Sequence, residues 1–134
     1  MPSGRNENMK IRTGTDIIEI SRVKSAIEDT DKKFCERVYT EKEIEYCEIK
    51  KAQKYQHYAA RFAAKEAVFK AISVMLPDKY DINWKDIEIL NDDTGRPYVN
   101  ILNHDIKSED VDISISHCKE YAVANAIFTI RDTH

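Results

Sequence analysis

The feature that most constrains the fold is the stretch 52–73, which contains neither glycine nor proline. Alanine, the strongest helix former, recurs throughout this stretch. Tyr58, Phe62, Phe69 and Ile72 follow one another at helical spacing. The pattern predicts one long helix. Because 134 residues is the length of a single domain, this helix is expected to pack against the rest of that domain.

The segments on either side of this helix predict an α+β fold. Alternating, β-branched residues predict a strand at 11–18, and Ser21 is expected to cap the helix that follows it. Thr40 and Glu43 form a capping box at the start of another helix. The further predicted elements are a short helix or turn at 34–38 and strands at 84–90, 98–102, 111–116 and 121–130. This order indicates an antiparallel sheet packed with a long central helix and shorter helices.

Composition excludes several classes of protein. The hydrophobic fraction of 42% and the charged fraction of 34% are typical of globular domains. We find no apolar run of about 18 residues and no apolar leader, so a soluble, cytoplasmic protein without a membrane partner is expected. The formal net charge of -3 argues against nucleic-acid binding. The polar residues 1–8 are interpreted as an extension that precedes one domain at 9–134.

Two carboxylates stand in apolar surroundings. Glu66 lies one helical turn from Phe62, and Asp16 interrupts a strand that otherwise has the pattern of a core strand. Carboxylates from two separate elements are the kind of ligand set that Mg²⁺ takes, with water and phosphate oxygens completing its shell. The alternatives are an ordinary ion pair along the helix between Glu66 and Lys70, and an edge-strand or turn position for Asp16.

Basic residues surround Glu66. Arg61 and Lys65 share a helix face beside Glu66, and Lys70 lies one turn beyond it. Bases that flank a metal-binding carboxylate suit a pyrophosphate ligand. The alternative is that they are solubilising residues on an exposed helix face. His117 ends the segment Ser114–His117. A strand would place Ser114 and Ser116 on one face and His117 on the other, which argues against a nucleophilic Ser/His pair and leaves a histidine that caps the end of the sheet.

Four motifs together resemble one known family. The segments are Gly14–Val23, Arg61–Ala71, Gly95–Pro97 and Ser114–His117. In order and spacing they are similar to the holo-acyl-carrier-protein synthases, the short, trimeric type of 4′-phosphopantetheinyl transferase. The resemblance extends from about Met9 to Phe128. Its most specific parts are the Gly-x-Asp of the first motif and the Lys-Glu-Ala-x-x-Lys-Ala of the helix, which runs from Lys65 to Ala71.

The resemblance implies an activity and a role for each candidate residue. The family transfers 4′-phosphopantetheine from coenzyme A to a serine of apo-acyl carrier protein, and adenosine 3′,5′-bisphosphate is released. The reaction depends on Mg²⁺ and serves fatty acid biosynthesis. The implied roles are Mg²⁺ ligation by Asp16 and Glu66, catalysis by Glu66 and Lys70, coenzyme A binding by Arg61, Lys65 and His117, and carrier-protein binding by Arg22 and Lys24. Either Glu66 or a metal-bound water would deprotonate the serine.

The resemblance also implies a homotrimer with active sites between subunits. Two other hypotheses assign the protein no catalytic activity. One is a non-catalytic module that binds coenzyme A or the carrier protein, and the other is a structural oligomerisation domain without a ligand. The presence of Asp16, Lys65, Glu66 and Lys70 together favours the enzyme.

Overall fold

The computed structural model describes residues 9–78 and 81–131, and the predicted extension at 1–8 lies outside them. Its centre is helix α4, Lys54–Ile72, which confirms the predicted long helix. A 3₁₀ turn at Lys51–Gln53 precedes α4 and another at Ser73–Met75 follows it. Six of the eleven buried residues of α4 are alanines, whose small side chains let neighbouring elements approach its backbone closely.

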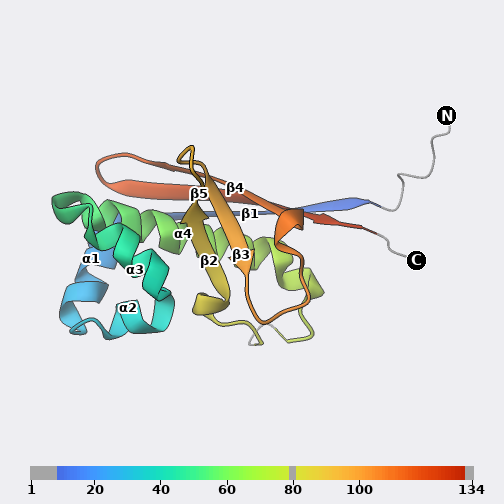
Figure 1. Ribbon diagram of the computed structural model, residues 1–134, viewed down its shortest axis with the longest axis horizontal. Coiled ribbons are helices and arrows are strands. Elements are labelled where there is room, and N and C mark those ends of the chain that lie inside the picture. Colours follow the sequence, from blue (N-terminus) through green and yellow to red (C-terminus); the bar gives the residue numbers. More distant parts are fainter. Residues whose placement is uncertain (1–8, 79–80, 132–134) are drawn as a thin grey trace.

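A three-stranded antiparallel sheet lies along α4 (Figure 1). Its order is β1, Lys10–Glu19, then β5, Tyr121–Ile130, then β4, Val111–His117. β5 is therefore the central strand, between β1 and β4. Ala122, Ala124 and Ala126 of β5 face inward and are buried. These small side chains bring the sheet down onto the helix.

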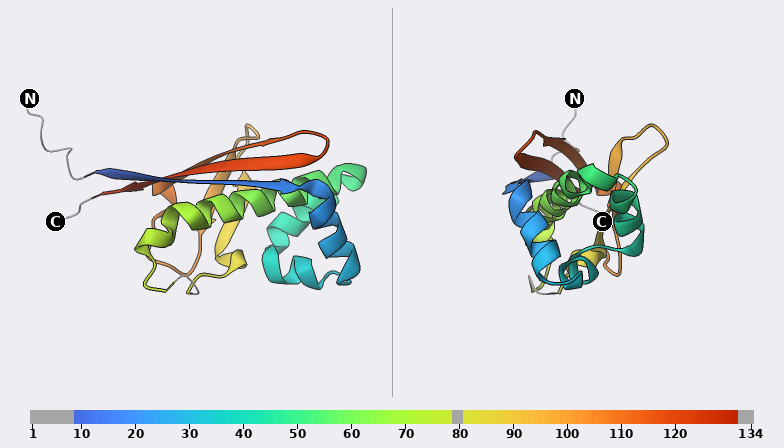
Figure 2. Two further views of the ribbon diagram at one scale, coloured as in Figure 1. Left: turned by 180° about the vertical axis from the view of Figure 1, so that it is seen from behind. Right: turned by 90° about the vertical axis from the view of Figure 1, so that its left-hand side faces the viewer.

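A group of short helices and a β-hairpin cover the sides of α4 that the sheet leaves open. Viewed along the long axis in Figure 2, the sheet, the short helices and a hairpin surround α4. The short helices are α1, Ile20–Asp29, α2, Lys33–Val38, and α3, Glu41–Glu48. The hairpin is formed by β2, Ile87–Asn91, and β3, Pro97–Ile101. The predicted α+β architecture, with an antiparallel sheet, a long central helix and shorter helices, is confirmed.

Local predictions are confirmed at some element ends and wrong at others. The capping box of Thr40 and Glu43 is present at the start of α3. The predicted cap at Ser21 is wrong, because α1 begins at Ile20 and its first turn has no side-chain cap. The predicted strand at 84–90 begins only at Ile87. Residues Trp84–Asp86 form a 3₁₀ turn, stabilised by reciprocal capping between Asn83 and Asp86.

Gly14 sets the distance between β1 and α4. A Cβ atom at this position would lie 2.0 Å from the carbonyl oxygen of Ala67 and 3.0 Å from the amide nitrogen of Ala71. The two backbones are therefore in direct contact at this point. Asp16 follows two residues later on the same face of the strand, since side chains alternate along a strand. The close contact at Gly14 thus holds Asp16 against the middle of α4.

We expect Gly14→Ala to destabilise the protein by about 3 kcal/mol, the upper end for overpacking in a core. Neither backbone can shift without disturbing the sheet or the helix. Urea unfolding followed by circular dichroism measures this change. Gly95→Ala is the control, because Gly95 has a positive φ of 88° but nothing within 4 Å of the added Cβ. A smaller loss for Gly14→Ala than for Gly95→Ala would contradict this account.

Among the described residues, no helix is both long and apolar enough to cross a bilayer. The outer face of the three-stranded sheet carries several large apolar side chains. Ile11, Ile17, Tyr121 and Ile127 are all exposed on it. In both views of Figure 2, no described helix or strand covers this face.

Candidate active site

Asp16, Glu66 and Lys70 meet where β1 crosses α4. Glu66 and Lys70 are one turn apart on α4, and Asp16 faces them from the sheet. The Nζ of Lys70 donates to the Oδ1 of Asp16 at 3.3 Å and to the carbonyl oxygen of Thr15 at 2.9 Å. Lys70 is thus tied to β1, which differs from the simple helix pair that the spacing alone allowed.

The electrostatics of this group fit a divalent cation. Burial raises the pKa of Glu66, the negative charge of Asp16 raises it further, and Lys70 partly opposes the shift. Two carboxylates whose negative charges repel each other in this way are stabilised when a cation lies between them. The described residues contain no cluster of three or more metal-binding side chains. Asp16 and Glu66 therefore fit Mg²⁺, which needs only one or two carboxylates when phosphate and water supply the remaining oxygens.

A hollow of about 500 Å³ opens beside these carboxylates. Asp16 and Glu66 line it together with Arg22 of α1 and the rings of Phe34 and Phe62. The ring of Phe62 is held in place by stacking on Trp84, with a centroid distance of 5.1 Å. The lining of the hollow therefore combines charged side chains, which suit a metal and phosphate, with aromatic rings, which suit an uncharged part of a ligand.

Lys65 is fully buried and paired within the protein, so its contact with coenzyme A stays a prediction that this position does not support. Its side chain is fully buried, and its Nζ lies 2.7 Å from the Oε1 of Glu43, whose side chain is equally buried. The same Nζ also donates to the carbonyl oxygens of Ile87 at 2.6 Å and Trp84 at 3.0 Å. These three acceptors use all three donors of an ammonium group. Lys65 thus joins α4 to α3 and to the start of β2.

Arg61 and His117 lie on another side of α4 from Lys70. Arg61 is only 3% exposed, and its guanidinium lies 3.9 Å from the ring centroid of Tyr46 and donates to Asn91. Its Nε is buried and has no hydrogen-bond partner among the described residues. His117 is exposed at the end of β4, and its ring lies near that of His57. Contact of Arg61 and His117 with coenzyme A stays a prediction.

The two predicted carrier-binding residues occupy different places on α1. Both are exposed, but only Arg22 lines the hollow that contains Asp16 and Glu66. Lys24 lines a smaller hollow of about 310 Å³ with Lys119, and its Nζ lies over the ring of Tyr55. The structure therefore places Arg22 at the mouth of the candidate site and Lys24 beside it.

Sequence reasoning missed several residues that support the site. Glu43 was interpreted only as a helix cap, although its second oxygen also accepts from the amide of Ile89 at 2.8 Å. Tyr46, His57 and Asn91 were not singled out. The spacing of His57 and Arg61, one helical turn apart, was the one available signal that these two share a face.

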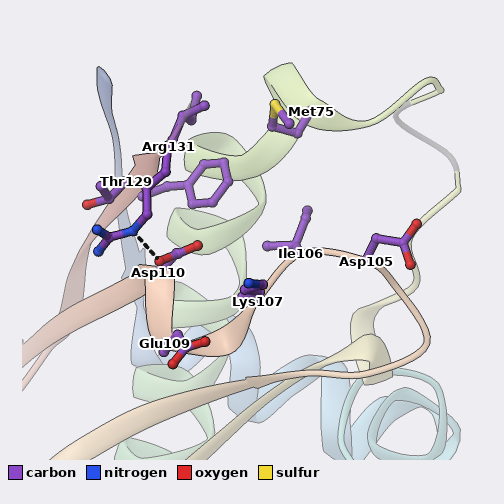
Figure 3. Close-up of a pocket in the computed structure, with 10 residues that line it drawn as sticks. Met75, Asp105, Ile106, Lys107, Glu109, Asp110, Thr129 and Arg131 are labelled. Carbon is purple, nitrogen blue, oxygen red and sulfur yellow. Dashed lines mark hydrogen bonds and ion pairs between the residues drawn. The ribbon is translucent and has the colours of Figure 1, made fainter. Parts of the chain in front are cut away.

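A larger hollow of about 710 Å³ lies near the C-terminal ends of α4 and β5 (Figure 3). It is lined by Met75, Asp105, Ile106, Lys107, Glu109, Asp110, Phe128, Thr129, Ile130 and Arg131. Arg131 is paired with Asp110 at 3.0 Å, as the dashed line in Figure 3 marks. Its carboxylates outnumber its bases, so this hollow is poorly suited to a ligand with several phosphates.

Comparison with known proteins agrees with this geometry. The family model for the 4′-phosphopantetheinyl transferase superfamily matches residues 12–126. A holo-[acyl-carrier-protein] synthase of Ruminiclostridium cellulolyticum is 46% identical over 131 residues, which cover 93% of this chain and 96% of that relative.

Solved structures of similar proteins include two with coenzyme A. The holo-(acyl-carrier-protein) synthase from Bacillus anthracis, in complex with CoA (3′,5′-ADP), has a TM-score of 0.74 at 35% identity, covering 90% of this chain and 97% of that one. The Helicobacter pylori enzyme in complex with coenzyme A has a TM-score of 0.71 at 28% identity, covering 85% and 96%. Since the family model spans most of the chain and the similar proteins match it almost from end to end, this chain belongs to the 4′-phosphopantetheinyl transferase superfamily.

Proposed function

We propose that this protein transfers 4′-phosphopantetheine from coenzyme A to a serine of apo-acyl carrier protein and releases adenosine 3′,5′-bisphosphate. The observation that carries the proposal is the meeting of Asp16, Glu66 and Lys70 where β1 crosses α4, with both carboxylates lining one hollow. The relatives' names and their complexes with coenzyme A support it. Its place in fatty acid biosynthesis and in the cytoplasm stays a prediction, as does a single domain at 9–134.

The chemistry that the site must perform is a displacement at phosphorus. The serine oxygen of the carrier protein forms a bond to the phosphorus next to pantetheine, while the anhydride bond of the pyrophosphate breaks. The electron pair of the broken bond leaves on the 5′-phosphate of the nucleotide. Mg²⁺ held by Asp16 and Glu66 would neutralise charge on the pyrophosphate.

The chain's own residues have three tasks in this reaction. Lys70, held between β1 and α4, places its ammonium beside the carboxylates, where it stabilises the charge of the reacting phosphate. We assign acceptance of the serine proton to Glu66, the carboxylate whose pKa burial raises. Arg61 and His117 are assigned to the phosphates of the nucleotide, which agrees with the buried Nε of Arg61 having no hydrogen-bond partner within residues 9–78 and 81–131.

Arg22 is proposed to contact an acidic surface of the carrier protein at the mouth of the hollow. We expect Arg22→Glu to raise the KM for the carrier about tenfold, with a smaller change in the KM for coenzyme A. Steady-state kinetics at low and high salt measure this, and the effect should shrink at high salt. Arg131→Glu is the charge-matched control at the far end of the molecule. Equal effects of the two variants would remove Arg22 from the docking surface.

A homotrimer is proposed, with the outer face of the three-stranded sheet as the contact between subunits. Isoleucines exposed on this face would leave water on assembly. We expect Ile127→Lys to convert a trimer of 15.6 kDa chains into smaller species in analytical ultracentrifugation. Ile49→Lys is the control, because Ile49 is even more exposed but lies at the end of α3. A wild-type monomer, or an Ile127→Lys trimer, would contradict the assignment of this face.

The experiment that separates the enzyme from a non-catalytic module measures binding and release together. Coenzyme A with Mg²⁺ should raise the unfolding temperature of the protein, because a ligand that binds only the folded state stabilises it. With apo-acyl carrier protein added, chromatography should then show adenosine 3′,5′-bisphosphate. Stabilisation without any release of this product would favour the module over the enzyme.

A further inference from the structure

We propose that His57 is an additional phosphate-binding residue of the coenzyme A site, and that its protonation is linked to binding of the nucleotide. This inference rests on the proposed function. It concerns a cluster that we call the cationic cluster, which consists of Lys50, His57, Arg61 and His117. Its members come from α4, the end of β4 and the loop after α3.

Ring contacts hold His57 within this cluster. Its imidazole lies 6.0 Å from that of His117 and 5.6 Å from the ring of Tyr46, measured between centroids. Both contacts are edge-to-face. Arg61 follows one helical turn later and rests on the same tyrosine ring, as does the Nζ of Lys50 at 4.7 Å. Tyr46 is therefore the common surface on which the cluster is assembled.

Among the described residues, the charged groups that act on His57 at the centre of the cluster include no anion. The charged groups that act on His57 are Lys50, Arg61 and His117, and each of them is a cation or becomes one on protonation. The ring of Tyr46 faces His57 from α3. Gathering cations in this way is unfavourable unless an anion binds among them. The buried Nε of Arg61, without a partner among the described residues, is a donor that such an anion would satisfy.

The protonation of His57 should respond to that anion. In the free protein, burial lowers the pKa of His57, and the positive charges of Lys50, Arg61 and His117 lower it further. A phosphate dianion reverses the effect of these charges and raises the pKa of His57 in the complex. Binding therefore takes up protons near neutral pH. Its extra affinity is present at low pH and is lost as the pH rises through the pKa of the complex.

Calorimetric binding of adenosine 3′,5′-bisphosphate tests this directly. Titrations at pH 6.0 to 8.5, in buffers of different ionisation enthalpy, give the affinity and the number of protons taken up. We expect His57→Phe, which keeps a ring against Tyr46, to weaken binding about tenfold at pH 6 and less than about twofold at pH 8.5. It should also take up fewer protons than the wild type. The phosphate's own protonation is common to both proteins and cancels in the comparison.

A second variant separates charge from packing. His57→Lys carries a charge that does not titrate in this range, so its binding should not lose the His57 contribution between pH 6 and pH 8.5. Identical proton uptake and pH dependence in wild type and His57→Phe would overturn the inference while leaving the proposed function intact. If the wild type neither binds the nucleotide at any pH nor transfers phosphopantetheine, the proposed function fails and the inference fails with it.

Discussion

We expect Asp16→Ala and Glu66→Ala each to lower the rate of phosphopantetheine transfer about a thousandfold, the scale seen when a group that stabilises transition-state charge is removed. The reason is that both carboxylates face one hollow and are the two residues that fit Mg²⁺ there. The rates are measured at saturating coenzyme A and carrier protein, with Mg²⁺ varied. Neither variant should recover its rate when Mg²⁺ is raised.

The folded state should survive both substitutions. Burial and the charge of Asp16 raise the pKa of Glu66, so at neutral pH its ionised form destabilises the folded protein, and alanine removes this penalty. Thermal unfolding of Glu66→Ala should therefore occur at no lower temperature than that of the wild type. Asp112→Ala, which removes an exposed carboxylate of β4 paired with Arg96, is the control for activity. Retained transfer in both site variants would refute the metal-binding role.

Lys65→Met should cost about 3–5 kcal/mol of unfolding free energy, the range for breaking one half of a buried ion pair. The variant leaves the carboxylate of Glu43 buried opposite an apolar side chain and frees the carbonyl oxygens of Trp84 and Ile87. Urea unfolding measures the loss. The double variant Glu43→Gln with Lys65→Met carries no buried charge at this place, so it should recover part of the stability.

The KM of the Lys65→Met enzyme for coenzyme A distinguishes a structural role of Lys65 from direct contact with the ligand. If enough folded enzyme is present at low temperature, the KM for coenzyme A should stay within a few-fold of the wild-type value. A stable Lys65→Met protein with a KM for coenzyme A raised more than about tenfold would instead mean that the ammonium reaches a phosphate. That result would contradict the buried position.

The residues at the centre of the site were predictable because local patterns identify them. Asp16 in a β-branched strand and Glu66 on an apolar helix face are both unusual, and unusual polar residues in core-like segments indicate function. Their meeting depends on Gly14, which allows β1 to touch the backbone of Ala67. A glycine two residues before the aspartate is visible in the sequence, but the partner backbone that requires it is not.

The role of Lys65 could not be read from the same helix. Its neighbours in sequence place it beside Glu66, where a base facing a phosphate is the natural interpretation. Its burial depends on Glu43, which lies on a different helix, α3, and on the carbonyl oxygens of Trp84 and Ile87. The capping box correctly predicted that Glu43 caps α3. Because that role already explained the residue, its ion pair with Lys65 was not predicted. Side-chain burial set by distant elements is beyond what periodicity reports.

The element boundaries that were wrong share one cause. Trp84–Asp86 has the alternation of a strand, but capping between Asn83 and Asp86 closes a 3₁₀ turn. Ser21 has the chemistry of a helix cap, but α1 has already begun at Ile20, whose amide donates to the carbonyl oxygen of Glu120. In both places a hydrogen bond outside the local pattern decides where the element starts.

The most direct test of the account is the intact mass of an acyl carrier protein after incubation with this protein, coenzyme A and Mg²⁺. We expect the carrier to gain one phosphopantetheinyl group, and we expect neither a chelator-treated reaction nor the Glu66→Ala enzyme to produce this gain. An unchanged mass for several apo-carriers, with wild-type protein shown to be folded, would contradict the proposed transfer.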